Sequence, residues 1–370
     1  MKLALDLTAL CRRHTGMEYY ALNLSRALLE TDGRDEFHLF FRREIHPELK
    51  PFAARAVLHL SPLDNQVAAE QAWIPYMERK IKADLIHFPA FPPGLLSKTP
   101  KVATVFDSTL WRKTERLSWK AKVYFAPLAG RALKNARKIL TISENAKSEI
   151  AAAAKVPEEK IVVSYLAPDP LFEKPVTEEN KRTVRAKYAL PERFILSVAT
   201  LEPRKNLTGL LNCFARLSEK DPDTRLILAG RLAWGKDGIL KRISELKLEK
   251  HAHLLGYVSK EDLPAVYALA DFLAFPSFYE GFGLPVLEAQ SVGTPVLCSN
   301  TSSLPEVAGS SAFFVDPHVE ESVADGLKKL WESPALKKDL ILKGKENVAR
   351  FSWCRTAEAT RSAYKEAVHG

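Results

Sequence analysis

Two glutamates flank a glycine-containing loop in the second half of the chain. Glu280 directly precedes the loop Gly281-Phe282-Gly283-Leu284, and Glu288 follows the loop, eight positions after Glu280. The glycines let backbone N–H groups approach a ligand closely, and a helix beginning here adds partial positive charge. A phosphate fits such a helix end, while the carboxylates can accept hydrogen bonds from hydroxyl groups. This segment therefore predicts a site for a phosphorylated, hydroxyl-rich ligand.

The flanking residues supply the elements that position this loop. The apolar run Phe272–Phe275 predicts a buried strand before it, and Pro285 suits the first turn of a helix. Gly293 ends the helix, and Pro295 begins the next strand. Two acids at this spacing are commonly only a solvated helix face. The order of strand, glycine loop, capped helix and second strand favours a ligand site instead.

A basic pair follows another predicted strand. Arg204 and Lys205 come after Phe194–Ala199 and precede a helix that we expect to begin near Asn206. Two cations here could hold a diphosphate and stabilise negative charge as it leaves. The alternative is a pair of solvated charges, but cations are unfavourable at a helix N-terminus, which favours a ligand. Glu202 could orient either cation.

Short apolar runs alternate with longer amphipathic stretches such as Glu18–Glu30 from end to end of the chain. The predicted strands are Leu3–Leu7, Phe37–Phe41, Ala56–Leu60, Asp84–Phe88, Val102–Phe106, Ile139–Ile142, Ile161–Val163, Phe194–Ala199, Arg225–Ala229, Ala252–Leu255, Phe272–Phe275, Val296–Cys298 and Ala312–Val315. This alternation predicts an α/β protein of two doubly wound (Rossmann-like) parallel-sheet domains.

The domain boundary is expected in the middle of the chain. We predict an N-terminal domain over 1–172 and a C-terminal domain over 173–351, each long enough for its own core. The polar, proline-bearing stretch Pro168–Glu192 is the best candidate linker. Ligands of such sheets bind beyond the carboxyl ends of the strands, so two facing domains would make one cleft.

Composition is ordinary for a soluble globular protein, with 46% hydrophobic and 27% charged residues. The four cysteines form no C-x-x-C pair, which indicates reduced thiols in a cytoplasmic protein. The start of the chain does not resemble a signal peptide, because Asp6 interrupts a short apolar run. No run of about 18 apolar residues predicts a membrane span.

The net charge of +9 is concentrated in the stretch 112–138, which has nine basic residues against Glu115. Leu128, Ala132 and Ala136 repeat there at helical spacing, with Arg131 and other basic residues on another face. Such a stretch can lie on an anionic membrane surface, so we expect peripheral attachment to the inner face of the membrane. The alternative is a solvated helix face. No nucleic-acid-binding module accompanies the charge.

The second half of the chain resembles family four of the retaining nucleotide-sugar glycosyltransferases, which have the GT-B fold. The family signature is Glu, seven residues, Glu, as from Glu280 to Glu288. The match extends over the segments 201–207, 253–258, 291–296 and 302–309, and more loosely over 141–147 and the first strand and loop.

The resemblance implies roles in the second half of the chain. Glu280 would hold sugar hydroxyls, Glu288 the ribose diol, and the Arg204–Lys205 pair the donor diphosphate. The backbone N–H groups of Gly281, Phe282, Gly283 and Leu284 would face the far phosphate and the sugar. Tyr257 and Val258 would border the nucleobase, although an aromatic residue beside a strand end is often only packing.

It also implies features of the first domain. The helix within 352–370 would cross back onto that domain, Gly16 would lie near the sugar and acceptor, and Asp107 on the acceptor side. Many relatives have His-Asp where this chain has Phe106 and Asp107. Either another side chain, for example His87, replaces the missing imidazole and the donor is an ordinary hexose, or the donor is a 6-deoxyhexose whose methyl group suits an apolar ring.

We expect no metal or other cofactor. Asp221-Pro222-Asp223 has the Asp-x-Asp form of metal-dependent glycosyltransferases, but Asp and Pro are also typical of a turn before a strand. No His/Cys cluster has zinc spacing. The positive charge that a cation would supply can come from Arg204 and Lys205.

The resemblance, together with the basic pair and the glycine loop, therefore implies a retaining, metal-independent hexosyltransferase. It would move a mannose- or rhamnose-like sugar from a nucleotide diphosphate to a hydroxyl of a glycan or lipid-linked acceptor, as in assembly of cell-surface polysaccharides such as lipopolysaccharide. Two alternatives remain: a non-catalytic nucleotide-sugar-binding protein and a sugar 2-epimerase on the same fold. The nucleobase, sugar, acceptor and oligomeric state are left open.

Overall fold

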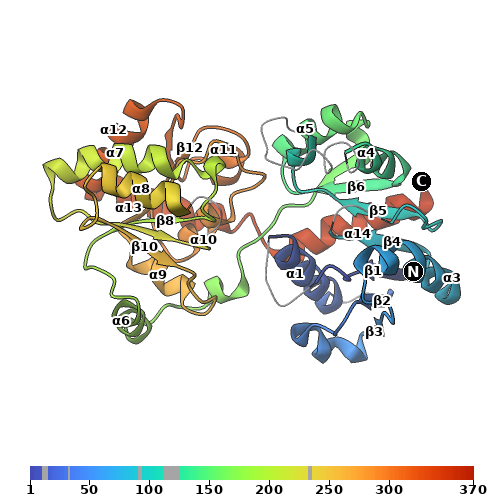
Figure 1. Ribbon diagram of the computed structural model, residues 1–370. Coiled ribbons are helices and arrows are strands. Elements are labelled where there is room, and N and C mark those ends of the chain that lie inside the picture. The colour runs from blue at the N-terminus through green and yellow to red at the C-terminus, as the bar shows by residue number, and fades with distance from the viewer. Residues whose placement is uncertain (11–15, 32–33, 91–93, 112–125, 232–235) are drawn as a thin grey trace. The chain divides into compact units, whose positions relative to one another are not determined.

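The structure is a computed structural model that describes residues 1–10, 16–31, 34–90, 94–111, 126–231 and 236–370. The chain forms two compact units. Unit 1 comprises Met1–Leu166 and Ser352–Gly370, and unit 2 comprises Ala167–Phe351. The division falls a few residues before the boundary expected at 172. Figure 1 shows the helices and strands of each unit.

Unit 1 is built on a seven-stranded sheet in the order β3-β2-β1-β4-β5-β6-β7, with every described pairing parallel. Its strands are β1 (Lys2–Asp6), β2 (Glu36–Phe41), β3 (Ala56–Leu60), β4 (Leu85–Phe88), β5 (Lys101–Thr104), β6 (Lys138–Thr141) and β7 (Ile161–Val163). Each strand predicted in the first half of the sequence is present.

Helices cover both faces of this sheet. The main ones are α1 (Gly16–Glu30), α3 (Ile74–Ile81), α4 (Ala126–Asn135), α5 (Glu144–Ala154) and α14 (Trp353–His369). Ser143 and Ser352 begin α5 and α14 by accepting a hydrogen bond from an N–H of the first turn. The last helix, α14, packs on α1 and so belongs to unit 1 (Figure 1).

A buried polar network joins α1, β4, β5 and α14. Thr104 Oγ1 lies 2.8 Å from His87 Nε2 and 3.1 Å from the Tyr20 hydroxyl. His87 Nδ1 lies 2.6 Å from the Tyr364 hydroxyl. Complete burial lowers the pKa of His87 to about 3, because a charged imidazole would be desolvated there. His87 is therefore neutral at physiological pH, and both of its ring nitrogens are used inside the unit.

Unit 2 is built on a six-stranded sheet in the order β10-β9-β8-β11-β12-β13, again parallel throughout. Its strands are β8 (Ile195–Val198), β9 (Leu226–Ala229), β10 (Ala252–Gly256), β11 (Phe272–Phe275), β12 (Val296–Ser299) and β13 (Phe313–Val315). These strands again fall within the predicted runs or differ from them by one residue. Both predicted doubly wound sheets are thus present.

Successive strand residues of unit 2 enter two separate hydrophobic cores. In β11, Phe272 and Ala274 face one core while Leu273 and Phe275 face the other. The first core is covered by α7 (Leu207–Lys220), α8 (Lys236–Glu245), α12 (Glu320–Glu332) and α13 (Pro334–Val348). The second is covered by α6 (Glu178–Lys187), α9 (Leu263–Leu269), α10 (Leu284–Ser291) and α11 (Leu304–Ala308). Burial on both faces explains the uninterrupted apolar runs in the sequence.

The prediction that Pro168–Glu192 is a linker is wrong. Helix α6 forms within it, with a capping box between Thr177 and Asn180. Phe172 and Val184 are buried in the second core of unit 2. The polar composition that indicated a linker belongs to the solvent-facing side of α6, which hides its few apolar anchors in the sequence.

Candidate active site

The predicted site residues of unit 2 lie at the carboxyl ends of adjacent strands. The loop after β8 has Glu202, Arg204 and Lys205, and the loop after β11 leads to Glu280. Because β8 and β11 pair directly in parallel, these two loops emerge side by side at one edge of the sheet. Phe278 N–H donates to the Arg204 carbonyl at 2.8 Å, which fixes one loop against the other.

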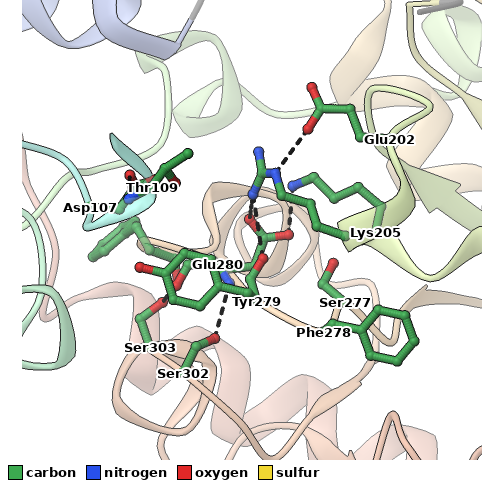
Figure 2. Close-up of polar contacts among 12 residues, drawn as sticks. Asp107, Thr109, Glu202, Lys205, Ser277, Phe278, Tyr279, Glu280, Ser302 and Ser303 are labelled. Carbon is green, nitrogen blue, oxygen red and sulfur yellow. Dashed lines mark hydrogen bonds and ion pairs between the residues drawn. The ribbon is translucent and has the colours of Figure 1, made fainter. Parts of the chain in front are cut away.

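Glu280 is the centre of the polar cluster (Figure 2). Its Oε1 accepts a hydrogen bond from Lys205 Nζ at 2.5 Å, and its Oε2 accepts one from the Arg204 guanidinium at 3.3 Å. The Arg204 Nε donates to Glu202 at 2.8 Å, as predicted from the sequence for that acid. Glu280 is only 6% exposed and Lys205 only 9%. Glu280 is thus brought into direct contact with a basic pair that lies about 75 residues earlier in the chain.

Charge in this cluster is closely balanced. Burial lowers the pKa of Lys205, and the neighbouring Glu280 carboxylate opposes that shift by stabilising the ammonium. Arg204 and Lys205 bring two positive charges, which Glu202 and Glu280 match with two negative ones. A diphosphate that used these two cations would therefore compete with Glu280 for them.

Two serines after β12 hold the backbone that presents Glu280. The Glu280 N–H donates to Ser302 Oγ at 3.0 Å, and Ser303 Oγ lies 2.9 Å from the Glu280 carbonyl and 2.7 Å from the Phe282 carbonyl (Figure 2). Both serines fall in the segment 302–309 that matched the family, but their role as supports depends on the strand order. Sequence reasoning missed it for that reason.

Gly283 begins α10 with a conformation that other residues disfavour. Its φ is +118°, and a Cβ there would lie 2.6 Å from Leu304 Cδ2. Pro285 lies in the first helical turn, as predicted. The first N–H groups of a helix lack partners within it, so this end can accept an anion. The Phe282 ring packs edge-on against Phe351, which leaves only its backbone for a ligand.

Glu288 lies on α10 and faces α9. Its Oε2 accepts a hydrogen bond from the Tyr267 hydroxyl at 2.7 Å. Burial raises the pKa of Glu288 to about 7, despite this hydrogen bond, which favours the ionised form. The sequence indicated Glu288 as a ligand-binding acid but gave no sign of Tyr267, because the partner comes from another helix.

The two residues predicted to border a nucleobase differ in their exposure to solvent. Tyr257 is 62% exposed, and the Arg231 guanidinium lies 5.5 Å from the centre of its ring. Val258 is buried in the second core, so only its backbone is available to a ligand. Arg231 was not singled out in the sequence. Its neighbour Gly230 has φ +143° and no room for a Cβ, which would lie 2.0 Å from the Ala199 carbonyl oxygen; this glycine is the signal that could have marked the end of β9.

The predicted site residues of unit 1 are Asp107 and Gly16. Asp107 follows β5, and its carboxylate accepts a hydrogen bond from the Thr109 N–H at 2.9 Å (Figure 2). Gly16 is exposed at the start of α1, with open space where a Cβ would be. Phe106 packs edge-on against Tyr20, with ring centres 5.2 Å apart. Because both nitrogens of His87 are engaged in the interior, His87 does not replace the missing imidazole.

The aspartates considered as metal ligands have structural partners. Asp221 accepts hydrogen bonds from the Trp331 indole at 2.8 Å and from the Asp223 N–H at 3.1 Å. Across the described residues, no group of three or more His, Cys, Asp or Glu side chains is arranged to hold a metal ion. None of the helices in the described ranges is both long and apolar enough to cross a bilayer.

The basic stretch 112–138 lies partly outside the described residues, which exclude 112–125. In its described part, Ala132 and Ala136 are buried and Leu133 packs in the core of unit 1. Lys138 forms an ion pair of 2.6 Å with Glu366. The apolar face of the described part of this helix therefore packs on the sheet, and the membrane attachment expected for the stretch stays a prediction.

The fold is that of the GT-B glycosyltransferases, and comparison with known proteins identifies the family. The model of "Glycosyl transferases group 1" matches residues 180–347, and that of "Glycosyltransferase Family 4" matches residues 14–170. The chain is 31% identical over 371 residues to O-antigen chain mannosyltransferase B of Escherichia coli, covering 95% of this chain and 96% of that protein. The chain belongs to glycosyltransferase family four.

Solved structures agree in fold. A glycosyltransferase from Rickettsia africae has a TM-score of 0.77 at 17% identity, covering 99% of this chain and 98% of that one. The Anabaena protein HepE, solved in complex with UDP and glucose, has a TM-score of 0.76 at 17% identity, covering 99% of each chain. These likenesses confirm the predicted fold class.

Proposed function

We propose that this protein transfers mannose from a nucleoside diphosphate to a hydroxyl of a growing surface polysaccharide, with retention of the anomeric configuration. The observation that carries the proposal is the contact of Glu280 with Lys205 and Arg204 at the carboxyl edge of the unit 2 sheet. The choice of mannose and of a polysaccharide acceptor rests on the O-antigen mannosyltransferase that resembles the chain over nearly its whole length.

Donor binding uses the residues of unit 2. Arg204 and Lys205 hold the diphosphate, the N–H groups from Gly281 to Leu284 face the far phosphate, and Glu288 accepts both ribose hydroxyls. The nucleobase lies against the exposed ring of Tyr257 and the backbone of Val258. Glu280, released from the cations by the diphosphate, accepts hydrogen bonds from sugar hydroxyls.

The transfer needs no protein base. The acceptor oxygen attacks the anomeric carbon on the face from which the diphosphate departs, and the departing phosphate oxygen takes the proton of the acceptor hydroxyl. Arg204 and Lys205 stabilise the negative charge on the leaving group, so the reaction proceeds without a divalent cation. We place the acceptor near Asp107 and Gly16 of unit 1, and we propose an anionic membrane as a partner.

The experiment is transfer from GDP-, UDP- and dTDP-linked sugars to a soluble mannosyl oligosaccharide, with the products resolved by chromatography. Extension of the oligosaccharide by one hexose supports the proposal. Nucleotide binding without any turnover would instead identify a binding protein, and a changed sugar nucleotide without acceptor would identify an epimerase.

A further inference from the structure

A pocket of about 320 Å³ opens in unit 1 at the amino end of β5, away from the predicted site residues. Lys98, Lys101 and Arg137 line it, together with Leu95, Ser97 and Asn135. Lys101 is the first residue of β5, while Asp107 lies just beyond the other end of the same strand. The pocket and the expected acceptor side thus lie at opposite edges of one sheet.

The rim of this pocket carries an excess of positive charge. Among the described residues, no carboxylate forms an ion pair with Lys98, Lys134 or Arg137, all of which are exposed. Lys160 adds to the same patch, because its Nζ donates to the Lys134 carbonyl at 2.7 Å. The exposed cations at this edge of the sheet are therefore available to bind an anion.

The floor of the pocket is rigidly built. Lys101 is only 7% exposed, and its Nζ donates to the carbonyls of Gly94 at 3.2 Å and Ser97 at 2.9 Å. The buried acid Glu78 balances part of its charge and accepts hydrogen bonds from the Ser97 hydroxyl and the Lys98 N–H. These bonds fix the loop that runs past the pocket.

That loop presents two leucines to solvent. Leu95 is 37% exposed and Leu96 is 62% exposed, and the Leu95 N–H is held by Gln71 Oε1 at 2.9 Å. Apolar side chains fixed outward beside unpaired cations suit the boundary between lipid headgroups and acyl chains. A nucleic acid would use the cations but would leave the leucines exposed.

We propose that this edge docks on an anionic phospholipid bilayer, with a headgroup phosphate in the pocket beside Lys98 and Arg137 and with Leu95 and Leu96 in the acyl boundary. The inference rests on the proposed function, because docking there leaves the opposite edge of unit 1 pointing away from the bilayer. A chain-extending enzyme needs that orientation, since the free end of a lipid-anchored glycan lies off the membrane.

The test is flotation of the whole protein with vesicles of phosphatidylcholine, with and without 30% phosphatidylglycerol. Each basic residue near such a surface strengthens membrane binding about fivefold at low salt, so loss of two in the Lys98→Glu/Arg137→Glu variant should weaken partitioning at least 25-fold. Leu96→Ser should weaken binding about tenfold. The matched control is Lys50→Glu/Lys80→Glu, which changes the same number of exposed charges elsewhere in unit 1 and should bind as the wild type.

Three results would overturn the proposal. They are failure of the wild-type protein to float with anionic vesicles at low salt, equal loss in the pocket and control variants, and unchanged flotation of the pocket variant. Calorimetric binding of inorganic phosphate to the wild type but not to the pocket variant, with equal flotation of both, would assign the pocket to a free phosphate. Transfer to a soluble acceptor, measured in parallel, tests the proposed function separately.

Discussion

Replacing Glu280 by glutamine tests whether this acid competes with the donor diphosphate. The wild-type side chain is almost fully buried between Lys205 and Arg204. Glutamine keeps the shape but removes the charge, which leaves Lys205 as an unpaired buried cation. Removing one partner of a buried pair costs about 3–5 kcal/mol. Because glutamine still offers an acceptor, we expect the lower end of that range in the protein without nucleotide.

A nucleoside diphosphate should then bind more tightly to Glu280→Gln than to the wild type. In the wild type, the diphosphate must displace charge-assisted hydrogen bonds that contribute about 1.5–3 kcal/mol, and in the variant it need not. This difference corresponds to roughly ten- to hundredfold tighter binding by calorimetry. Turnover should fall by a similar factor, because the acceptor for the sugar hydroxyls has lost its charge.

Glu202→Gln is the matched control. Glu202 also pairs with Arg204, but its side chain is 38% exposed, and exposed pairs contribute about 0–1 kcal/mol. The nucleotide affinity of Glu202→Gln should therefore stay within a few-fold of the wild type, and its free energy of unfolding within about 1 kcal/mol. Equal or weaker binding of the diphosphate by Glu280→Gln would refute the idea that Glu280 occupies the diphosphate cations in the free protein.

Three further predictions concern the nucleotide, the loop and the sugar. The Glu288 pKa of about 7 means that the carboxylate needed for the ribose diol is half protonated at pH 7; nucleotide affinity should rise about fivefold from pH 6 to pH 7. Glu288→Gln should lose this pH dependence and bind about tenfold more weakly, and a parallel pH profile in both proteins would argue against the ribose assignment. Gly283→Ala should destabilise unit 2 by about 1–3 kcal/mol in chemical denaturation, because its Cβ would overlap Leu304 at a positive φ; unchanged stability would mean that the loop relaxes freely. Phe106→His should raise the preference for a 6-hydroxylated donor over its 6-deoxy counterpart in direct competition, and an unchanged ratio would place the outer sugar hydroxyl away from Phe106.

The spacing of apolar residues and the positions of Gly and Pro at element ends were sufficient to predict the architecture. Strands buried on both faces leave uninterrupted apolar runs, and helix spacing separates them, so both sheets could be placed in advance. The stretch Pro168–Glu192 was misjudged because α6 is mostly polar. Phe172, Val184 and Leu190 join the core, and three apolar residues spread over such a stretch give no clear period.

The site was predictable where residue type alone indicates chemistry. Glu280, Arg204 and Lys205 were each singled out, but their mutual contact depends on β8 pairing with β11, which the order of elements along the chain does not specify. For the same reason the support of Glu288 by Tyr267 was out of reach, because it comes from a separate helix.

The basic stretch 112–138 shows a different limit of prediction from the sequence. Ala132 and Ala136 form a stripe that suits either a membrane or a protein core, and only the tertiary structure, in which both are buried, decides between them. Leu95, Leu96 and Lys98 are neighbours in sequence, but Arg137 reaches the same pocket from a separate segment, so no single stretch of sequence indicated the whole patch.

The most direct test of the account is the anomeric configuration of the product. Wild-type protein would be incubated with a sugar nucleotide, a soluble mannosyl acceptor and excess EDTA, and the new glycosidic linkage would be followed by NMR from the first turnovers. We predict extension of the acceptor by one hexose in the donor's own anomeric configuration, with full activity in the chelator. An inverted linkage, or activity that returns only when magnesium or manganese is added, would contradict the assigned roles of Arg204, Lys205 and Glu280.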